Sequence, residues 1–352
     1  MFDLPAYDSH EKVTMVEDAE TGLKAIIAVH STALGAAAGG CRLWTYDSDS
    51  SALVDALRLS RGMSYKNAMA DLAMGGGKAV ICGPVTPENR TRIFEAFGRA
   101  VDALQGQYIT AEDVGVSVAD MQIVATQTKF VSGLSGGEGK SGGDPSPFTA
   151  RGVRVGIEAA VRSVFSRDDL EGLKIAVQGL GHVGMYLCDE LASRGAKLVV
   201  ADINAGRVNE AQDRFGATAV HVDDILMQAV DIVAPCALGG TITEAVATAL
   251  DAKIVAGAAN NQLLTPEAGR ILARRGILYA PDYVINAGGI IMVAGEISGN
   301  NAESAVLAAV DKIGNRLGDI FQRTKSDQSI TNEVADLMAQ DKIRAARKLK
   351  AA

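Results

Sequence analysis

The 352-residue chain has few of the residues that build disulfides and metal sites. No two of its four cysteines form a C-x-x-C pair; they are Cys41, Cys82, Cys188 and Cys236. This spacing favours reduced thiols, so we expect a cytoplasmic protein. The four histidines include no i, i+4 pair and no nearby group of ligands, and no metal site is therefore predicted.

Long runs of one charge and long apolar runs are also scarce. The net charge is −8, and the one basic block, residues 344–350, is typical of a solvated helix end, so nucleic acid is not an expected partner. The N-terminus carries charged residues and lacks the apolar core of a signal peptide. The apolar region 277–293 is interrupted by Pro281, Asp282 and Asn286, so no membrane span is expected.

Apolar residues are abundant and make up 48% of the chain, which is enough to form the cores of two domains. Glycine, serine and proline cluster at Ser132–Pro147, which predicts a linker. We expect a substrate and oligomerisation domain over residues 1–134 and a dinucleotide-binding domain over residues 145–324. Helices after Ser304 either return to the first domain or form subunit contacts, and for residues 325–352 we expect the return.

Two lysines in the first half, Lys66 and Lys78, flank an apolar segment that ends in the glycines 75–77. Three consecutive glycines pack poorly in a helix or a strand, so we expect a close approach of backbone or ligand there. Burial and a neighbouring ammonium favour the neutral form of a lysine. Lys78 is therefore a candidate general base. The alternative is a tight turn with two solvated lysines.

The same half contains a second candidate for proton transfer. A short strand at Tyr108–Thr110 leads to the carboxylates of Glu112 and Asp113. Because α/β proteins place polar chemistry at strand ends, Asp113 is a candidate proton carrier. The alternative is an aspartate that caps a turn or a helix. Upstream, the small residues from Gly35 to Arg42 predict a loop, which is either close packing or one wall of a small-molecule pocket.

The second half alternates strands and helices. The strand Lys174–Gln178 is followed by Gly179-Leu-Gly181-His-Val-Gly184 and then a helix, which is the G-x-G-x-x-G pattern in its required context. The next strand ends at Asp202, where an acid accepts hydrogen bonds from a ribose 2′-hydroxyl and repels a 2′-phosphate. The pattern predicts NAD as the cofactor. The alternative is a glycine-rich turn in an unrelated domain.

Later strands also end in small or polar residues, which we expect to face the cofactor because ligands bind beyond the carboxyl ends of parallel strands. One strand leads to Ala234-Pro235-Cys236, another to Gly257-Ala258-Ala-Asn260-Asn261, and the last to a segment that contains Asn286. The asparagines offer donors and acceptors to a nicotinamide amide or a substrate carboxylate. The alternative for each is an ordinary turn.

Taken in order, these motifs resemble the amino acid dehydrogenases of the glutamate, leucine, phenylalanine and valine family, the leucine type most and the phenylalanine type next. The resemblance covers nearly the whole chain. The matching segments are Gly39–Tyr46, Tyr65–Asn67, Met74–Lys78, Tyr108–Val114, Asp202–Asn204, Ala234–Gly239, Val255–Gln262 and Tyr279–Gly289.

The resemblance implies a fold, a reaction and residue roles. The fold is an N-terminal α/β substrate domain and a Rossmann-type doubly wound domain, with a cleft that closes between them, and the assembly is a homo-oligomer. The reaction is the reversible NAD-dependent deamination of an L-amino acid to its 2-oxo acid and ammonia. Lys66 would hold the substrate carboxylate, Lys78 would activate water, and Asp113 would carry protons to and from the amino nitrogen. Nicotinamide and substrate would be held by Thr149 and Asn260, and the rest of NAD by Gly179, Leu180, Gly181, His182, Val183, Gly184, Asp202 and Asn204.

The substrate side chain is expected to be apolar. At the position of Ala38, glutamate-specific relatives carry a lysine and leucine-type relatives usually carry a leucine. Ala38 leaves more room in the pocket than leucine and in this respect resembles some phenylalanine-type relatives. Ala111, by contrast, matches the leucine type. The remaining pocket residues are expected to be Gly39, Gly40, Met63, Ile290 and Val293. We expect leucine or another branched-chain substrate, with phenylalanine as the alternative. A non-catalytic NAD-binding regulator and a 2-hydroxy acid dehydrogenase are further alternatives; the first would not need the lysines, and the second would need a histidine base.

Overall fold

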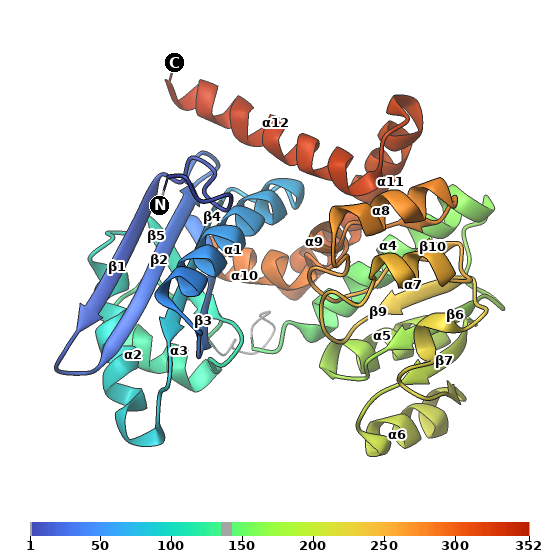
Figure 1. Cartoon of the computed structure of the whole chain (residues 1–352), viewed down its shortest axis with the longest axis horizontal. Helices are drawn as coiled ribbons and strands as arrows, with labels where there is room; N and C mark the ends of the chain where they lie inside the picture. Colours follow the sequence, from blue (N-terminus) through green and yellow to red (C-terminus); the bar gives the residue numbers. More distant parts are fainter. Residues whose placement is uncertain (1, 135–142, 352) are drawn as a thin grey trace. The chain divides into compact units, whose positions relative to one another are not determined.

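The computed structural model describes residues 2–134 and 143–351, and the chain forms two compact units (Figure 1). The first unit comprises Met1–Gly143, Val293–Glu303 and Met338–Ala352, and the second comprises Asp144–Met292 and Ser304–Leu337. Most of the linker expected at Ser132–Pro147 lies at 135–142, outside the described residues.

The first unit contains a five-stranded sheet in the order β1-β2-β4-β3-β5. In it β2 pairs antiparallel with β1 and β4, whereas β3 pairs parallel with β4 and β5. The strands are β1 (Lys12–Asp18), β2 (Leu23–Ser31), β3 (Ala37–Trp44), β4 (Gly75–Cys82) and β5 (Tyr108–Glu112).

Helices cover both faces of this sheet. The long helix α1 (Asp49–Met69) packs Ala52, Ala56 and Leu57 on one face, against Val80 of β4. On the other face α2 (Pro87–Asp102) and α3 (Val118–Ala125) bury Phe94, Phe97 and Met121 against β2 and β4. Apolar residues at helical spacing build both layers, because burial of such a stripe supplies most of a helix's stability.

Two expectations about the backbone conformation of the glycine-rich segments were wrong, whereas the close approach of backbone expected at Gly75–Gly77 is present. The expected loop from Gly35 to Arg42 is largely the inner strand β3, and Gly75–Gly77 begin the buried strand β4. Neighbouring groups occupy the space that side chains would need. A Cβ at Gly76 would lie 2.0 Å from the backbone nitrogen of Ser64, and one at Gly77 would lie 2.6 Å from the ring of Tyr108. The glycines therefore serve close packing of helix and ring on the strand.

The helix α1 is capped at its N-terminus and spans 21 residues. It begins after the cap Ser48, whose side chain accepts a hydrogen bond from the Ser51 backbone, and continues to Met69. Lys66 consequently lies in the last turn of α1. The small residue Ser64 in this part of the helix packs directly on Gly76 of β4.

The second unit contains a parallel sheet in the order β11-β10-β9-β6-β7-β8. Counted from β6, this is the 3-2-1-4-5-6 order of the doubly wound dinucleotide-binding fold, with its switch point between β6 and β9. The predicted fold class is confirmed. The strands are β6 (Lys174–Gln178), β7 (Lys197–Ala201), β8 (Thr218–Ala219), β9 (Ile232–Pro235), β10 (Ile254–Val255) and β11 (Leu278–Tyr279).

The remaining helices follow these strands. α4 begins at Ser146, with Pro147 in its first turn. α10 begins in the second unit and ends in the first, and α12 does the same. The helices are α4 (Ser146–Phe165), α5 (His182–Ala192), α6 (Ala205–Phe215), η1 (Ile225–Met227), α7 (Glu244–Ala249), α8 (Pro266–Arg274), α9 (Asp282–Ile285), α10 (Gly288–Ser298), α11 (Glu303–Asp327) and α12 (Thr331–Ala351).

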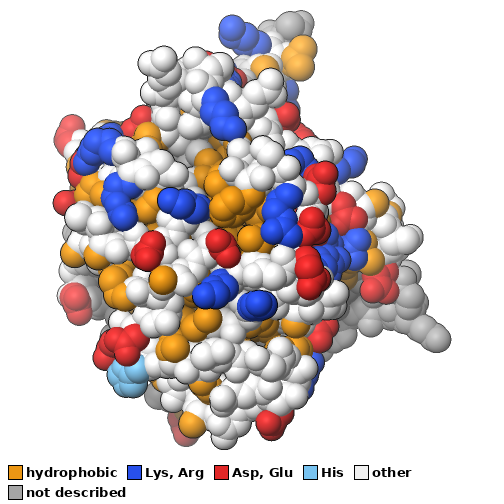
Figure 2. Space-filling model, turned by 90° about the vertical axis from the view of Figure 1, so that its right-hand side faces the viewer, with side chains coloured by type: hydrophobic (Ala, Val, Ile, Leu, Met, Phe, Trp, Pro, Cys, Tyr) orange, Lys and Arg blue, Asp and Glu red, His pale blue; other side chains and the backbone are white. Residues whose placement is uncertain are grey.

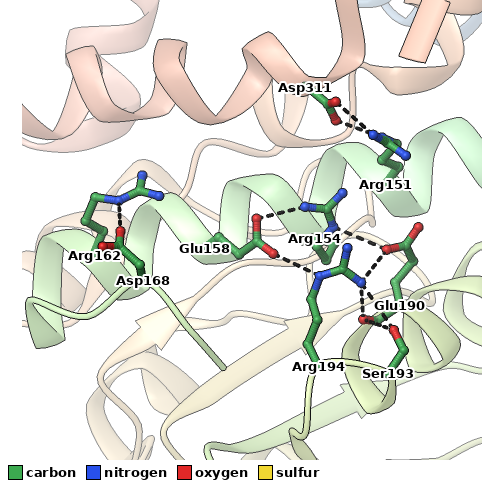
Figure 3. A network of polar contacts seen from close by, with 9 residues as sticks. All are labelled: Arg151, Arg154, Glu158, Arg162, Asp168, Glu190, Ser193, Arg194 and Asp311. Atoms are coloured by element: carbon green, nitrogen blue, oxygen red, sulfur yellow. Dashed lines mark hydrogen bonds and ion pairs between the residues drawn. The ribbon is translucent and has the colours of Figure 1, made fainter. Parts of the chain in front are cut away.

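A network of ion pairs joins α4 to α5 in the second unit (Figure 3). The Arg154 side chain, 8% exposed, donates to Glu158 at 2.8 Å and to Glu190 at 3.2 Å. Arg194 contacts the same two carboxylates. On the other side of α4, Arg151 pairs with Asp311 of α11. The network thus fixes α5 relative to α4.

On one face of the molecule, charge is mixed rather than segregated. Figure 2 shows one face, on which lysine and arginine side chains alternate with aspartate and glutamate. In the part of the chain that the structure describes, no helix combines the length and the apolarity that a membrane crossing requires.

Candidate active site

Lys78 and Asp113 form an ion pair in the first unit. Lys78 Nζ lies 2.8 Å from Asp113 Oδ2, and the lysine residue is 5% exposed. Lys78 belongs to β4, and Asp113 directly follows β5. The sequence therefore identified two residues that the fold brings together. The charged partner of Lys78 in this contact is the carboxylate of Asp113. From the sequence, the neighbouring charge was expected to be the ammonium of Lys66.

A glycine makes room for this pair. Gly40 of β3 stands opposite Ala111 of β5, and a Cβ on Gly40 would lie 2.9 Å from the Cβ of Asp113. Any side chain there would displace the aspartate from Lys78. The alternative role of Asp113 as a helix cap is wrong, because Ser117 caps α3 and the Asp113 carboxylate points to cations.

The electrostatic surroundings keep Asp113 ionised. Burial alone would raise the pKa of Asp113, but the Lys78 ammonium and then the Arg42 guanidinium outweigh burial and lower this pKa. Because the pair is largely shielded from water, the electrostatic attraction between its two charges is stronger than in an exposed pair. Asp113 is thus ready to accept a proton.

Three residues of this site were not identified as functional from the sequence. Arg42 of β3 donates from Nε to Asp113 Oδ2 and from Nη1 to Asp55 Oδ2, both at 3.1 Å. Tyr46 donates its hydroxyl to the same Asp55 oxygen at 2.7 Å. An arginine at the end of a small-residue strand was the available signal, but the register that places it beside Asp113 is a tertiary property.

Lys66 and Met63, the expected substrate-side residues of α1, are both partly buried. Met63 Cγ lies 3.1 Å from the position that a Cβ on Gly39 would occupy, so this methionine packs over β3. The helix is fixed to β4 by Asn67, which donates to the Gly75 carbonyl at 2.6 Å. Lys66 is therefore held on a rigid helix end.

The expected pocket alanines belong to the sheet. Ala38 of β3 is 1% exposed and stands between Gly76 of β4 and Ile109 of β5. Ala111 of β5 is partly buried. Ile290 and Val293 are partly buried residues of α10, the first in the second unit and the second in the first.

The glycine-rich turn of the second unit gives each glycine a separate function. Gly179 has φ +95°, and a Cβ on it would meet Ala237. A Cβ on Gly184 would lie 2.1 Å from the Gly179 carbonyl oxygen, so α5 packs tightly on the turn. Gly181 precedes α5, and a Cβ on it would meet nothing within 4 Å. This open position before a helix N-terminus fits a dinucleotide pyrophosphate.

Asp202 is bonded to this turn. Its Oδ2 accepts from the Leu180 backbone at 2.6 Å, and its Oδ1 accepts from the Asn204 backbone at 2.8 Å. Asn204 caps α6, with its side chain accepting from Arg207. Leu180 is buried, whereas His182 is exposed and Val183 partly buried in the first turn of α5. The predicted acid is therefore fixed directly beside the glycine-rich turn.

The ends of β9 and β10 meet the same region of the second unit. Ala234 and Pro235 are the last residues of β9, and the Cys236 backbone donates to the Gln178 carbonyl at 2.7 Å. Asn286 donates to the Ala258 carbonyl at 3.0 Å and to Asn260 Oδ1 at 2.7 Å. Among the described residues, the buried side-chain oxygens of Gln178 and Asn286 have no hydrogen-bond partner. Such acceptors are available to a bound ligand.

Thr149 lies in the first turn of α4 and donates its hydroxyl to the Pro145 carbonyl at 3.1 Å. A Cβ on Gly289 would come within 3.1 Å of that hydroxyl.

Within residues 2–134 and 143–351, no group of three or more histidine, cysteine, aspartate or glutamate side chains could hold a metal ion.

Two family models match the chain. One, described as the dimerisation domain of Glu/Leu/Phe/Val dehydrogenases, matches residues 9–130. The other, described as glutamate/leucine/phenylalanine/valine dehydrogenase, matches residues 202–351.

Individual relatives agree with these models over the full length. A leucine dehydrogenase from Geobacillus stearothermophilus is 49% identical over 98% of this chain and 93% of the relative. A phenylalanine dehydrogenase from Bacillus thermotolerans is 43% identical over 96% of this chain and 89% of the relative. The crystal structure of L-tryptophan dehydrogenase from Nostoc punctiforme has a TM-score of 0.86 at 41% identity, covering 97% of both chains.

Proposed function

Since this chain belongs to the Glu/Leu/Phe/Val dehydrogenase family, we propose that it catalyses the reversible NAD-dependent oxidative deamination of an apolar L-amino acid. The family resemblance inferred from the motifs is confirmed, and the chain is an amino acid dehydrogenase, an oxidoreductase that acts on CH–NH2 groups. Family members depend on a dinucleotide. The proposal adds the cofactor, the substrate class and the residue roles.

The observation that carries the proposal is the buried contact between Lys78 and Asp113 at 2.8 Å. In the proposed mechanism Lys66 binds the substrate carboxylate and Asp113 takes a proton from the substrate ammonium. When bound, NAD supplies the acceptor for the hydride that leaves Cα. Lys78, in its neutral form, then removes a proton from the water that attacks the resulting imine carbon. Asp113 returns its proton to the amino nitrogen and takes the proton of the new hydroxyl group as the C–N bond breaks, so that ammonia leaves and the 2-oxo acid forms.

The second unit supports NAD as the dinucleotide. The open position at Gly181 and the helix start at His182 would receive the pyrophosphate, and Asp202 would accept hydrogen bonds from the ribose. The carboxylate of Asp202 would repel a 2′-phosphate and so disfavour NADP. The acceptor oxygens of Gln178 and Asn286 would be available to the nicotinamide side.

A branched-chain substrate, leucine in particular, is proposed over an aromatic one. The leucine dehydrogenase relatives are 48–49% identical, against 43–44% for the phenylalanine and tryptophan dehydrogenases. Ala38 carries no charge that could pair with a second substrate carboxylate, which disfavours glutamate. We also propose a homo-oligomer, because the first family model is described as a dimerisation domain, and a cytoplasmic location, because the four cysteines are free thiols.

The test is reductive amination of a panel of 2-oxo acids with NADH and ammonium. The panel contains 4-methyl-2-oxopentanoate, 3-methyl-2-oxobutanoate, phenylpyruvate and 2-oxoglutarate. We expect the first to give the highest kcat/KM and NADPH to be a poor substitute. A preference for phenylpyruvate would establish the aromatic alternative, and turnover without ammonium would exclude an amino acid dehydrogenase.

Lys78→Ala tests the assigned base. It should lower kcat by at least about 10²-fold, the usual contribution of an acid–base group, while NADH still binds. Lys24→Ala is the matched control, since Lys24 lies on β2 of the same sheet and its side chain is 64% exposed. A Lys78→Ala enzyme with normal kcat would show that the role has been misassigned.

A further inference from the structure

Arg42 connects the Lys78–Asp113 pair to two further residues of the first unit. Arg42 stands opposite Val80 of β4, and Lys78 is two residues before Val80. Because alternate residues of a strand point to the same face, both side chains project from the same side of the sheet. Asp113 reaches over Gly40 and lies between them, in contact with both.

The contacts form one continuous chain. The Tyr46 hydroxyl donates to Asp55 Oδ2, the same oxygen accepts from Arg42 Nη1, and Arg42 Nε donates to Asp113 Oδ2. That Asp113 oxygen also contacts Lys78 Nζ. The side chains of Arg42, Asp55 and Asp113 are 24–27% exposed, so the contacts are partly shielded from solvent.

The two cations that contact Asp113 differ in one respect. In the proposed reaction the Lys78 amine gains and loses a proton, so its charge changes during the cycle. A guanidinium remains charged at every pH at which proteins are folded. Arg42 is therefore the constant positive charge beside the proton carrier. Asp55 opposes that charge, and Tyr46 holds Asp55 in place.

We propose that Arg42 is a positioning residue that keeps Asp113 ionised and aligned on Lys78, and that Asp55 and Tyr46 set the strength of this effect. The proposal rests on the assignment of Asp113 as the proton carrier. It predicts that the acid limit of the reaction, the pH below which the Lys78–Asp113 pair can no longer accept protons, depends on the charge of Arg42 and, in the opposite direction, on the charge of Asp55.

Two further titratable groups near Asp113, Cys41 and Tyr108, do not contribute to the acid limb. Cys41 and Tyr108 are completely buried, and burial raises the pKa of both. They remain neutral across the acid limb of a pH profile. Burial and then the Asp55 carboxylate likewise raise the pKa of Tyr46, so its hydroxyl stays a donor to Asp55.

The experiment compares the pH dependence of kcat/KM in four proteins and one control. Arg42→Gln removes the charge, and the acid limb should move to higher pH by about one unit, the lower end of the effect of an adjacent arginine on an aspartate. Arg42→Lys retains the charge and should restore most of that shift. Asp55→Asn leaves the charge of Arg42 unopposed, and the limb should move to lower pH. Arg58→Gln, an exposed arginine of α1, should match the wild type.

Opposite shifts in Arg42→Gln and Asp55→Asn would support the proposal, because general damage to the fold cannot move the limb in two directions. Lower kcat in both variants with an unmoved limb would overturn it. If the wild type turned over no amino or 2-oxo acid, the proposed function would fail instead. In that event a double-mutant cycle of Arg42→Gln and Asp113→Asn in urea unfolding still decides the inference, and a coupling of zero between the two residues would overturn it.

Discussion

Acid should destabilise the first unit through two buried histidines beneath α1. The rings of His10 and His30 are 4.9 Å apart, and the residues are 6% and 4% exposed. His30 Nδ1 is hydrogen-bonded to Ser64 Oγ at 2.8 Å, and His10 Nε2 lies 3.0 Å from both the Leu57 carbonyl and Ser60 Oγ. These contacts hold the half of α1 that carries Lys66.

Burial, and then the neighbouring His10, lower the pKa of His30 from 6.5 to about 4; the nearby Asp8 opposes this only in part. Burial also lowers the pKa of His10. The unfolded chain therefore binds protons on these rings at a higher pH than the folded chain does. Their contribution to stability is complete above about pH 6.5 and is lost as the pH falls toward 4. For His30, linkage gives a loss of about 2 kcal/mol between pH 7 and pH 5.

This loss of stability is measured by urea unfolding at several pH values. The protein concentration is kept fixed, because the stability of an oligomer depends on concentration. His30→Gln should lose about 2 kcal/mol less than the wild type between pH 7 and pH 5. His221→Gln, whose ring is 68% exposed, is the control and should behave as the wild type does. The comparison uses the difference between two pH values, so a lower baseline stability of a variant cancels. Equal losses in His30→Gln and wild type would refute the reasoning.

Three further predictions concern packing, the ion network and cofactor choice. Gly76→Ala should destabilise the protein by about 3 kcal/mol in thermal or urea unfolding, because the added methyl group would overlap the backbone of Ser64. The control is Gly62→Ala, which has open space around it and should be neutral or stabilising. Arg154→Ala should cost about 3 kcal/mol by removing a buried partner of Glu158 and Glu190, and the exposed Arg162→Ala should cost almost nothing; equal thermal shifts would contradict a buried network. Asp202→Asn should raise the NADPH-to-NADH ratio of kcat/KM about tenfold, equivalent to ~1.4 kcal/mol, and an unchanged ratio would show that this carboxylate does not select the cofactor.

The second unit could be predicted from the sequence more fully than the first. The bounds of β6 and β7, the glycine turn and Asp202 follow from local signals that the fold does not override. The glycine segments at 35–42 and 75–77 were not identified as strands because their conformation depends on tertiary contacts. The Tyr108 ring packs on Gly77, and the Tyr108 hydroxyl donates to the Gly39 carbonyl. The sequence did not identify Arg42, Asp55 and Tyr46 as site residues for the same reason, since only the folded sheet brings them to Asp113. The catalytic roles of Lys78 and Asp113 remain predictions that the proposed kinetics will test.

The side-chain-free stretch of β4 also limits how the enzyme can be engineered. Ser64, Tyr108 and the Ser31 carbonyl already fill the space above and below Gly75, Gly76 and Gly77, so a library at these positions would yield mostly unfolded protein. A search for altered substrate range should instead vary two residues of the proposed substrate pocket, Met63 and Ala111, which are only partly buried. The tolerance of the scaffold to redesign is therefore set by its glycines before any substrate is bound.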